Sequence, residues 1–179
     1  GSSLLVSDPD PEPHPHEQQS LAAILRQPAI IGFFVAVFLM QASHGPYYAF
    51  YSIYMKGHGY SETLIGQLWA LGVFAEVGLF VVMHRLLDGF GAHRVLAVSL
   101  LLAGLRWLII GHFADSLPML LVAQLLHAAT FGTFHAASIH LVQHYFRGRH
   151  KGRGQALYSS VSFGAGGAVG SLLSGYAWQ

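Results

Sequence analysis

The sequence contains no cysteine and has few charged residues, 9% of its 179 positions. The absence of cysteine excludes a disulfide framework and a thiolate metal site, and it leaves the redox compartment undetermined. Soluble domains have roughly 25% charged residues. A charged fraction this low, together with 53% hydrophobic residues, therefore indicates a chain that lies in lipid.

Basic residues are scarce as well, and the formal net charge is +1. The lysines and arginines are too few and too dispersed to form a surface that tracks phosphates, so nucleic acid is not an expected partner. No signal peptide is visible, because the first apolar residues, at 4–6, form too short a run. The chain begins without methionine, and we interpret it as a piece of a longer protein.

Five long apolar stretches follow one another along the chain. A helix needs about 20 mainly apolar residues to cross a hydrocarbon core of about 30 Å. Short turns separate the stretches, which leaves no room for a soluble catalytic domain, and no enzymatic activity is expected. The sequence therefore predicts an all-α membrane protein with spans at about 28–55, 63–86, 94–112, 117–146 and 155–177.

Residues 1–27 differ from the rest of the chain. Their core, SDPDPEPHPHEQQ, alternates proline with acids and histidines, which predicts an extended, largely disordered linker. Seven basic residues fall on one side of the predicted membrane, against Lys56 on the other, so this linker and the two basic turns expected at 87–94 and 146–154 should be cytoplasmic. The seven are Arg26, Arg85, Arg94, Arg147, Arg149, Lys151 and Arg153. An odd number of spans leaves the C-terminus outside. The chain stops at the end of the fifth span with no following loop, so we expect 28–179 to be a truncated unit without its sixth helix.

One short turn, RLLDGFGAHR at 85–94, resembles the acid, glycine and arginine signature of the cytoplasmic loops in the major facilitator superfamily. The matching residues are Asp88, Gly91 and Arg94. A tight glycine turn lets two helices start close together, and the two charged residues are placed to cap helix ends or to pair. The segments QASHGPYYAFYSIY, GYSETLIGQLWALGVFAEV, LRWLIIG, LLHAATFG and QALYSS together resemble the phenylpropionic acid permease branch of that superfamily, a relative of lactose permease.

This resemblance covers about residues 28–177. It implies the C-terminal half of a twelve-helix transporter, with helices seven to eleven present and 1–27 as the loop between the two halves. It further implies a bacterial inner membrane location and a missing partner, the N-terminal half of the same protein.

Glu76 lies in the middle of an otherwise apolar or small-residue run, LGVFAEVGLF at 71–80. A charged residue at the bilayer centre costs about 2.5–3.5 kcal/mol on insertion scales, and it usually faces the bundle interior. At 1.5 Å per residue, Glu76 and Arg106 each lie about 18 Å into the membrane. His127 and Gln41 reach a similar depth on two other spans. Four predicted helices therefore each bring one polar group to one layer near the midplane.

Two interpretations of this polar layer remain open. In one, Glu76 and Arg106 form a structural ion pair that locks two helices. In the other, the layer lines a substrate cavity at the midplane, where transporters built from repeated halves place their sites. The resemblance favours the second, because the lactose permease family keeps an arginine and a histidine that match Arg106 and His127. Thr130 stands where lactose permease has an acid, which leaves either Glu76 or His127 as the proton carrier.

The chemistry of the layer predicts a proton-coupled carrier. If Glu76 alternates between facing Arg106 and facing apolar surroundings, it alternately releases and binds a proton. Arg106 keeps its charge and can hold a substrate carboxylate with two parallel hydrogen bonds. An aromatic carboxylic acid fits this pairing.

The first span carries aromatic rings on both sides of a glycine-proline step that allows a bend. His44, Tyr47 and Tyr48 are expected near the cavity, where their rings and polar atoms can contact an aromatic ligand. Tyr51 and Tyr54 are expected in the aromatic belt at the outer interface instead.

Twelve histidines raise the question of a metal site. His140 and His144 are four apart on one helical face, with His135 and His150 nearby in the chain, but no H-E-x-x-H motif accompanies them. We therefore expect no metal and no cofactor.

The sequence and its resemblance together predict a proton-coupled secondary transporter of a small organic solute that works by alternating access. Its expected partners are that solute, protons and the lipid bilayer. A membrane scaffold or sensor that kept the fold without transport is the main alternative. A membrane-embedded metalloenzyme is a weaker one.

Overall fold

Five long helices make up most of the molecule in the computed structural model, which describes residues 20–178. All five are long and apolar enough to cross a membrane. They are α2 (Pro28–Gly57), α3 (Glu62–Phe90), α4 (Ala92–His112), the helix made of α5 (Leu117–His127), η2 (Ala128–Gly132) and α6 (Thr133–Tyr145), and the helix made of η3 (Gly148–His150), α7 (Lys151–Ser159), η4 (Ser160–Gly166) and α8 (Gly167–Ala177). The predicted all-α class and the five predicted spans are confirmed.

Two turns are shorter than the sequence predicted. The turn expected at 87–94 is reduced to Gly91, whose φ of +78° is a conformation that suits only glycine, so one residue separates α3 from α4. Asp88 and Arg94 are exposed, and no ion pair joins them among residues 20–178. The basic turn expected at 146–154 is mostly helical, because η3 and α7 begin at Gly148.

The end of the expected linker is folded. Residues 1–19 lie outside the described residues, but α1 (Leu21–Leu25) is a short helix with Ser20 as its N-cap, and the Ser20 hydroxyl accepts a hydrogen bond from the Ala23 amide. Ile24 is buried against the bundle. An apolar face, LAAIL, therefore anchors the segment just before α2, where the sequence predicted an extended chain.

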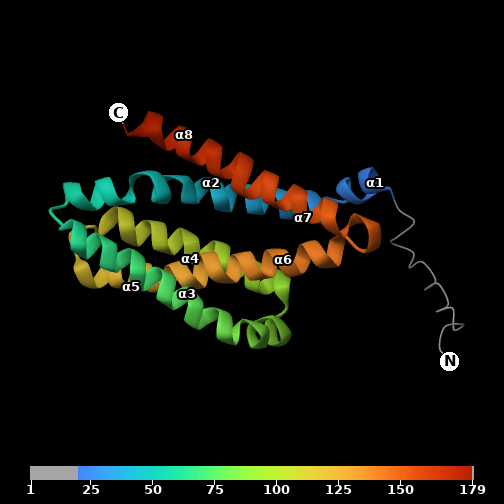
Figure 1. Ribbon diagram of the computed structural model, residues 1–179, viewed down its shortest axis with the longest axis horizontal. Coiled ribbons are helices and arrows are strands. Elements are labelled where there is room, and N and C mark those ends of the chain that lie inside the picture. The colour runs from blue at the N-terminus through green and yellow to red at the C-terminus, as the bar shows by residue number, and fades with distance from the viewer. Residues whose placement is uncertain (1–19, 179) are drawn as a thin grey trace, which may run out of the picture.

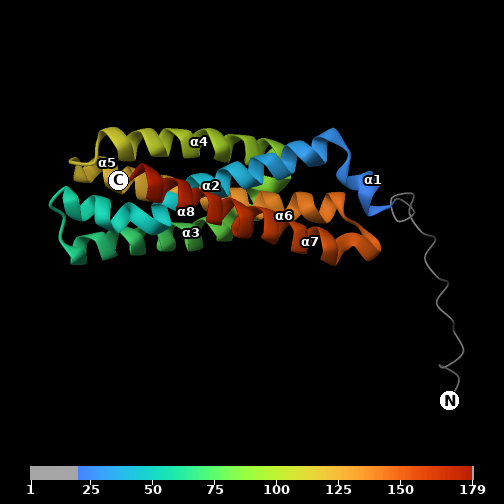
Figure 2. The same ribbon diagram turned by 90° about the horizontal axis from the view of Figure 1, so that it is seen from above.

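The long helices lie side by side along the molecule (Figure 1). The closest partner of α2 is the η4–α8 segment, while the α5–η2–α6 helix packs against α4 and α3. Figure 2 shows the same bundle from above, with the C-terminal end of α8 and the loop between α2 and α3 towards one end, and α1 at the other. Residues from α2, α3, α4 and the fourth long helix can therefore meet inside the bundle.

Glycines bring α2 and the η4–α8 segment into backbone contact. Gly166 and Gly170 stand four apart, the small-xxx-small spacing that permits close approach of membrane helices. A Cβ at Gly170 would overlap the backbone of Ala42, and one at Gly45 would overlap the backbone of Ser171. Glycine is therefore required on both sides of this contact.

Substitution of Gly170 by alanine should destabilise the protein. The added methyl group has to displace the Ala42 backbone, and such overpacking costs about 1–3 kcal/mol. Gly167→Ala is the matched control, because a Cβ there meets nothing within 4 Å. Thermal unfolding of the purified protein should show a lower midpoint for Gly170→Ala and an unchanged or higher one for Gly167→Ala. Equal midpoints would contradict the close contact.

The apolar core is divided into two parts by polar residues. One part surrounds Phe134 and Tyr158, towards the α1 end, and the other surrounds Tyr51 and Leu120, towards the opposite end. Buried polar side chains lie where the two parts meet. They are His44, Arg106, Gln124, His127 and Thr130. The polar layer predicted from the sequence therefore exists, although its membership differs.

Candidate functional site: a buried polar layer

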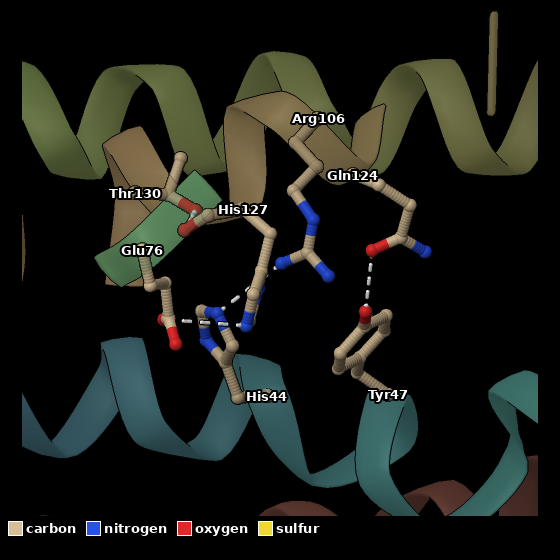
Figure 3. Close-up of polar contacts among 7 residues, drawn as sticks. All are labelled: His44, Tyr47, Glu76, Arg106, Gln124, His127 and Thr130. Carbon is tan, nitrogen blue, oxygen red and sulfur yellow. Dashed lines mark hydrogen bonds and ion pairs between the residues drawn. The ribbon is translucent and has the colours of Figure 1, made fainter. Parts of the chain in front are cut away.

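Arg106 is the centre of the polar layer (Figure 3). It projects from α4, has no exposed surface, and places its guanidinium carbon 4.2 Å from the centroid of the Tyr47 ring and 5.1 Å from that of Trp107. Such cation–π contacts stabilise a desolvated cation by about 2 kcal/mol or more. The guanidinium is thus held by rings rather than by an acid.

One edge of the guanidinium has no partner. Nη1 lies 3.2 Å from Nε2 of His44, whereas Nε and Nη2 have no hydrogen-bond partner in the described part of the chain. These two nitrogens share the edge that binds a carboxylate through two parallel N–H···O bonds. A buried charge without an anionic partner is costly, so this edge is a candidate ligand contact.

His44 fixes the position of the arginine. Because Nη1 of Arg106 can only donate, His44 Nε2 must accept, and the proton of His44 therefore sits on Nδ1. That nitrogen donates to the Met40 carbonyl at 2.9 Å, one helical turn away on α2. The hydrogen bonds assign His44 as a neutral imidazole that acts as a positioning residue for Arg106.

Glu76 pairs with His127 and not with Arg106. Glu76 Oε1 lies 3.6 Å from His127 Nε2, and this oxygen has no hydrogen-bond partner among residues 20–178. The ion pair between Glu76 and Arg106 that one sequence interpretation required is absent from the described residues. At 17% exposure the Glu76 side chain reaches the edge of the layer, whereas that of His127 is 7% exposed.

Gln124 is a member of the layer that sequence reasoning missed. Its Oε1 accepts a hydrogen bond of 2.7 Å from the Tyr47 hydroxyl, and its Nε2 donates to the Tyr51 hydroxyl at 2.6 Å. Tyr51 is 3% exposed, so its expected place in an outer aromatic belt was wrong. The signal that singled out Glu76, one polar residue in an apolar run, was equally present for Gln124 in LLVAQLLHAAT.

Three aromatic residues, Tyr48, Trp69 and Phe131, form what we call the aromatic cover of the layer. The Phe131 ring stacks on His127 with centroids 5.4 Å apart, and Trp69 lies 4.4 Å from the Tyr47 ring. Tyr48 stacks on Trp69 at 6.1 Å, and half of Tyr48 is exposed. The aromatic cover therefore separates the layer from the surroundings of the bundle.

The remaining predicted residues are placed differently. Gln41 is buried one turn before His44, where its Cβ lies beside Gly166 of η4, and its Oε1 has no partner in the described range. Asp88 lies in the last turn of α3, Gly91 between α3 and α4, and Arg94 in the first turn of α4, and they take no part in the layer. No group of three or more His, Asp or Glu residues that could hold a metal occurs within residues 20–178.

A π-helical segment follows His127 directly. Across η2 the hydroxyl of Thr130 donates to the His127 carbonyl at 3.1 Å, and the Thr133 hydroxyl donates to that of Ala129. π-Helical turns inside α-helices occur frequently at functional sites. The hydroxyl of Thr130 therefore serves the backbone of its own helix.

Five apolar spans around a buried polar layer define a polytopic, helical integral membrane protein. The sequence model of the MFS_1 like family matches residues 3–179, so the chain belongs to this branch of the major facilitator superfamily. The predicted resemblance is confirmed.

A curated relative covers most of this chain. The "Probable 3-phenylpropionic acid transporter" of Escherichia coli (strain K12) is 36% identical over 147 residues, which are 82% of this chain and 38% of the relative. The chain thus spans well under half of the length of that relative. No solved structure matches the chain.

Proposed function

We propose that the chain is the C-terminal half of a secondary transporter that carries a small aromatic carboxylate across a bacterial inner membrane together with protons. Alternating access requires a second half, so an N-terminal six-helix unit of the same protein is the necessary partner. The relative named "Probable 3-phenylpropionic acid transporter" supports this class of function. The finer assignment rests on Arg106.

The unpartnered edge of Arg106 is the observation that carries the proposal. A carboxylate bound to Nε and Nη2 would supply the missing countercharge and both missing hydrogen bonds at once. The rings of Tyr47 and Trp107 already contact the guanidinium, and the aromatic cover lies beside them. An aromatic group attached to the carboxylate would find apolar ring surfaces at short range.

Arg106 has no exposed surface, so in the proposed cycle a substrate reaches it only after surrounding side chains move. We assign this movement to the aromatic cover. Half-exposed Tyr48 is the member with the least packing to lose. In the proposed cycle, opening of this cover admits the substrate and its return excludes water from the charge pair.

Glu76 and His127 are the proposed proton-coupling pair. Their 3.6 Å separation is longer than a normal hydrogen bond, so neither side chain is locked in place by the other. Figure 3 shows the rings of His44 and His127, whose centroids are 5.8 Å apart, between the Glu76 carboxylate and the Arg106 guanidinium. Binding of a substrate anion at Arg106 therefore changes the electrostatic environment of both groups, which is the coupling that a symporter needs.

Competition with neutral analogues tests the carboxylate assignment. Uptake of labelled 3-phenylpropionic acid by cells that express the full-length protein should be inhibited by unlabelled acid. The same concentration of 3-phenylpropanamide or 3-phenylpropanol should inhibit far less, because neither offers two anionic oxygens to Arg106. A proton uncoupler should abolish accumulation. Equal inhibition by acid and amide would contradict the role of Arg106, and absence of uptake of any aromatic acid would favour a scaffold or sensor.

A further inference from the structure

A basic pocket lies at the α1 end of the bundle, away from the polar layer. It has a volume of about 360 Å³ and is lined by Ser20, Leu21, Arg149, His150 and Arg153. Figure 1 shows α1 beside the start of α7 at this end. Since α2 starts at Pro28 and the last span starts at Gly148, the pocket lies at the level of the helix ends, where lipid headgroups are found.

The charge that the described residues give this pocket is positive. None of the ion pairs within residues 20–178 involves Arg149 or Arg153, and none of the described lining residues is acidic. The first turn of α7 contains no acid either, so the positive end of the helix dipole adds to the field. Two guanidinium groups at one helix start favour a phosphate group, which each can bind in a forked geometry.

Buried His150 helps to build the pocket. It is 2% exposed, and Arg149 Nε donates to its Nε2 at 3.3 Å. Gly148, with a φ of +53°, begins the 3₁₀ turn that places Arg149 and His150 directly before α7. Arg149 is exposed, and its hydrogen bond to buried His150 orients the guanidinium.

An apolar groove lies one turn of α1 away. Leu21 lines the basic pocket, whereas Leu25 lines a groove of about 560 Å³ together with Val161 and one face of α2. On that face Ile31, Val35 and Leu39 are each about half exposed, which leaves a stripe without a protein partner in the described chain. A basic pocket next to an apolar groove matches the two parts of a phospholipid.

We infer that this end of the bundle is a binding site for an anionic phospholipid, whose phosphate lies between Arg149 and Arg153 and whose acyl chain follows the groove beside Leu25. Juxtamembrane basic clusters attract anionic lipids in general. This pocket differs from a general basic cluster because it offers the phosphate two guanidinium groups in one cavity. The site is separate from the polar layer, and its test does not depend on transport.

The inference is tested by measuring which lipids the purified protein retains. The full-length protein, purified in mild detergent, would be mixed with phosphatidylglycerol or phosphatidylcholine, and bound lipid counted by native mass spectrometry. Phosphatidylglycerol should be retained and phosphatidylcholine should not. The double variant Arg149→Gln with Arg153→Gln should weaken phosphatidylglycerol binding about tenfold or more, because two charged forks are lost.

The control removes equal charge from the same turn. Arg147→Gln with Lys151→Gln changes two residues that do not line the pocket, and Arg147 is held by the His144 carbonyl at 3.2 Å. This variant should lose only about two- to threefold through weaker surface attraction. Equal losses in the two double variants would overturn the inference, since only diffuse charge would then be involved.

Two further experiments distinguish the lipid from other anionic groups that could occupy the pocket. Glycerol 3-phosphate offers the same phosphate without acyl chains, so it should compete poorly, and full competition would identify the ligand as a free phosphate ester. Residues 8–17 contain Asp8, Asp10, Glu12 and Glu17, close in sequence to Ser20. If neutralising these four acids creates lipid binding that the wild type lacks, the acidic segment is the occupant and the lipid inference fails.

Discussion

Arg106→Met in the full-length protein should abolish binding of the aromatic acid and leave the protein as stable as before, or more stable. Loss of one partner of a buried, hydrogen-bonded charge pair costs about 2–5 kcal/mol, which corresponds to an affinity about 30- to 4,000-fold weaker. Without ligand, however, Arg106 is a buried charge with an unpartnered edge, and replacement of such a charge by an apolar side chain is often neutral or stabilising. Ligand affinity and the thermal midpoint of the free protein measure the two effects.

Arg106→Lys is the companion variant, because it keeps the charge and loses the planar fork. Its affinity should fall by about tenfold or more, as a single ammonium cannot make two parallel bonds to a carboxylate. A purely structural arginine would behave differently: Arg106→Met would then lower the thermal midpoint, since its contacts with His44 and Tyr47 would be lost. Unchanged affinity in the methionine variant would remove Arg106 from the substrate site.

The fold could be read from the sequence because lipid imposes a simple rule. Every backbone polar group in hydrocarbon must be bonded within its own segment, so long apolar runs become helices. The positions at which helices begin and end were harder to predict. Polarity at 146–154 suggested a turn, yet α7 begins within it, because lysine and arginine are good helix formers that extend into the headgroup layer. Polarity sets where the membrane ends, and it does not set where a helix ends.

The sequence predicted the depth of the polar residues in the membrane, but it did not predict which of their side chains are in contact. Counting residues along helices gave the level of Glu76, Arg106 and His127, because the rise per residue is fixed. Which side chains touch depends on the rotation and packing of neighbouring helices. The close glycine contact between α2 and the η4–α8 segment is part of this packing. The sequence alone does not specify its geometry. The expected pair of Glu76 with Arg106 was therefore replaced by Glu76 with His127, and Arg106 with His44.

The environment of Tyr51 also could not be predicted from the sequence. Tyrosines near a predicted span end are usually interfacial, and that tendency placed Tyr51 in a belt. The structure buries it because Gln124 on the neighbouring helix offers a hydrogen-bond acceptor to Tyr47 and a donor to Tyr51. A buried amide needs such partners, and two tyrosines one turn apart supply them.

Glu76→Gln should separate exchange from accumulation. If Glu76 carries the coupled proton, the amide variant cannot release or bind that proton, so uptake driven by a proton gradient should fall to the level of uninduced cells. Counterflow, the exchange of labelled for unlabelled substrate, should remain within about twofold of the wild type, because exchange needs no net proton transfer and Arg106 is untouched. Uptake and counterflow of the full-length protein in the same membrane vesicles measure both.

His127→Gln decides which member of the pair carries the proton. If His127 is the carrier, His127→Gln loses accumulation and Glu76→Gln keeps it; if the two act together, both variants lose accumulation and keep exchange. A structural pair gives a third pattern. Each single variant would then lower the amount of folded protein, and the double variant Glu76→Gln with His127→Gln would restore it, because the two side chains are in contact and their effects would not add. Recovery of gradient-driven accumulation in that double variant would exclude both residues as proton carriers, since neither an amide at 76 nor one at 127 can titrate.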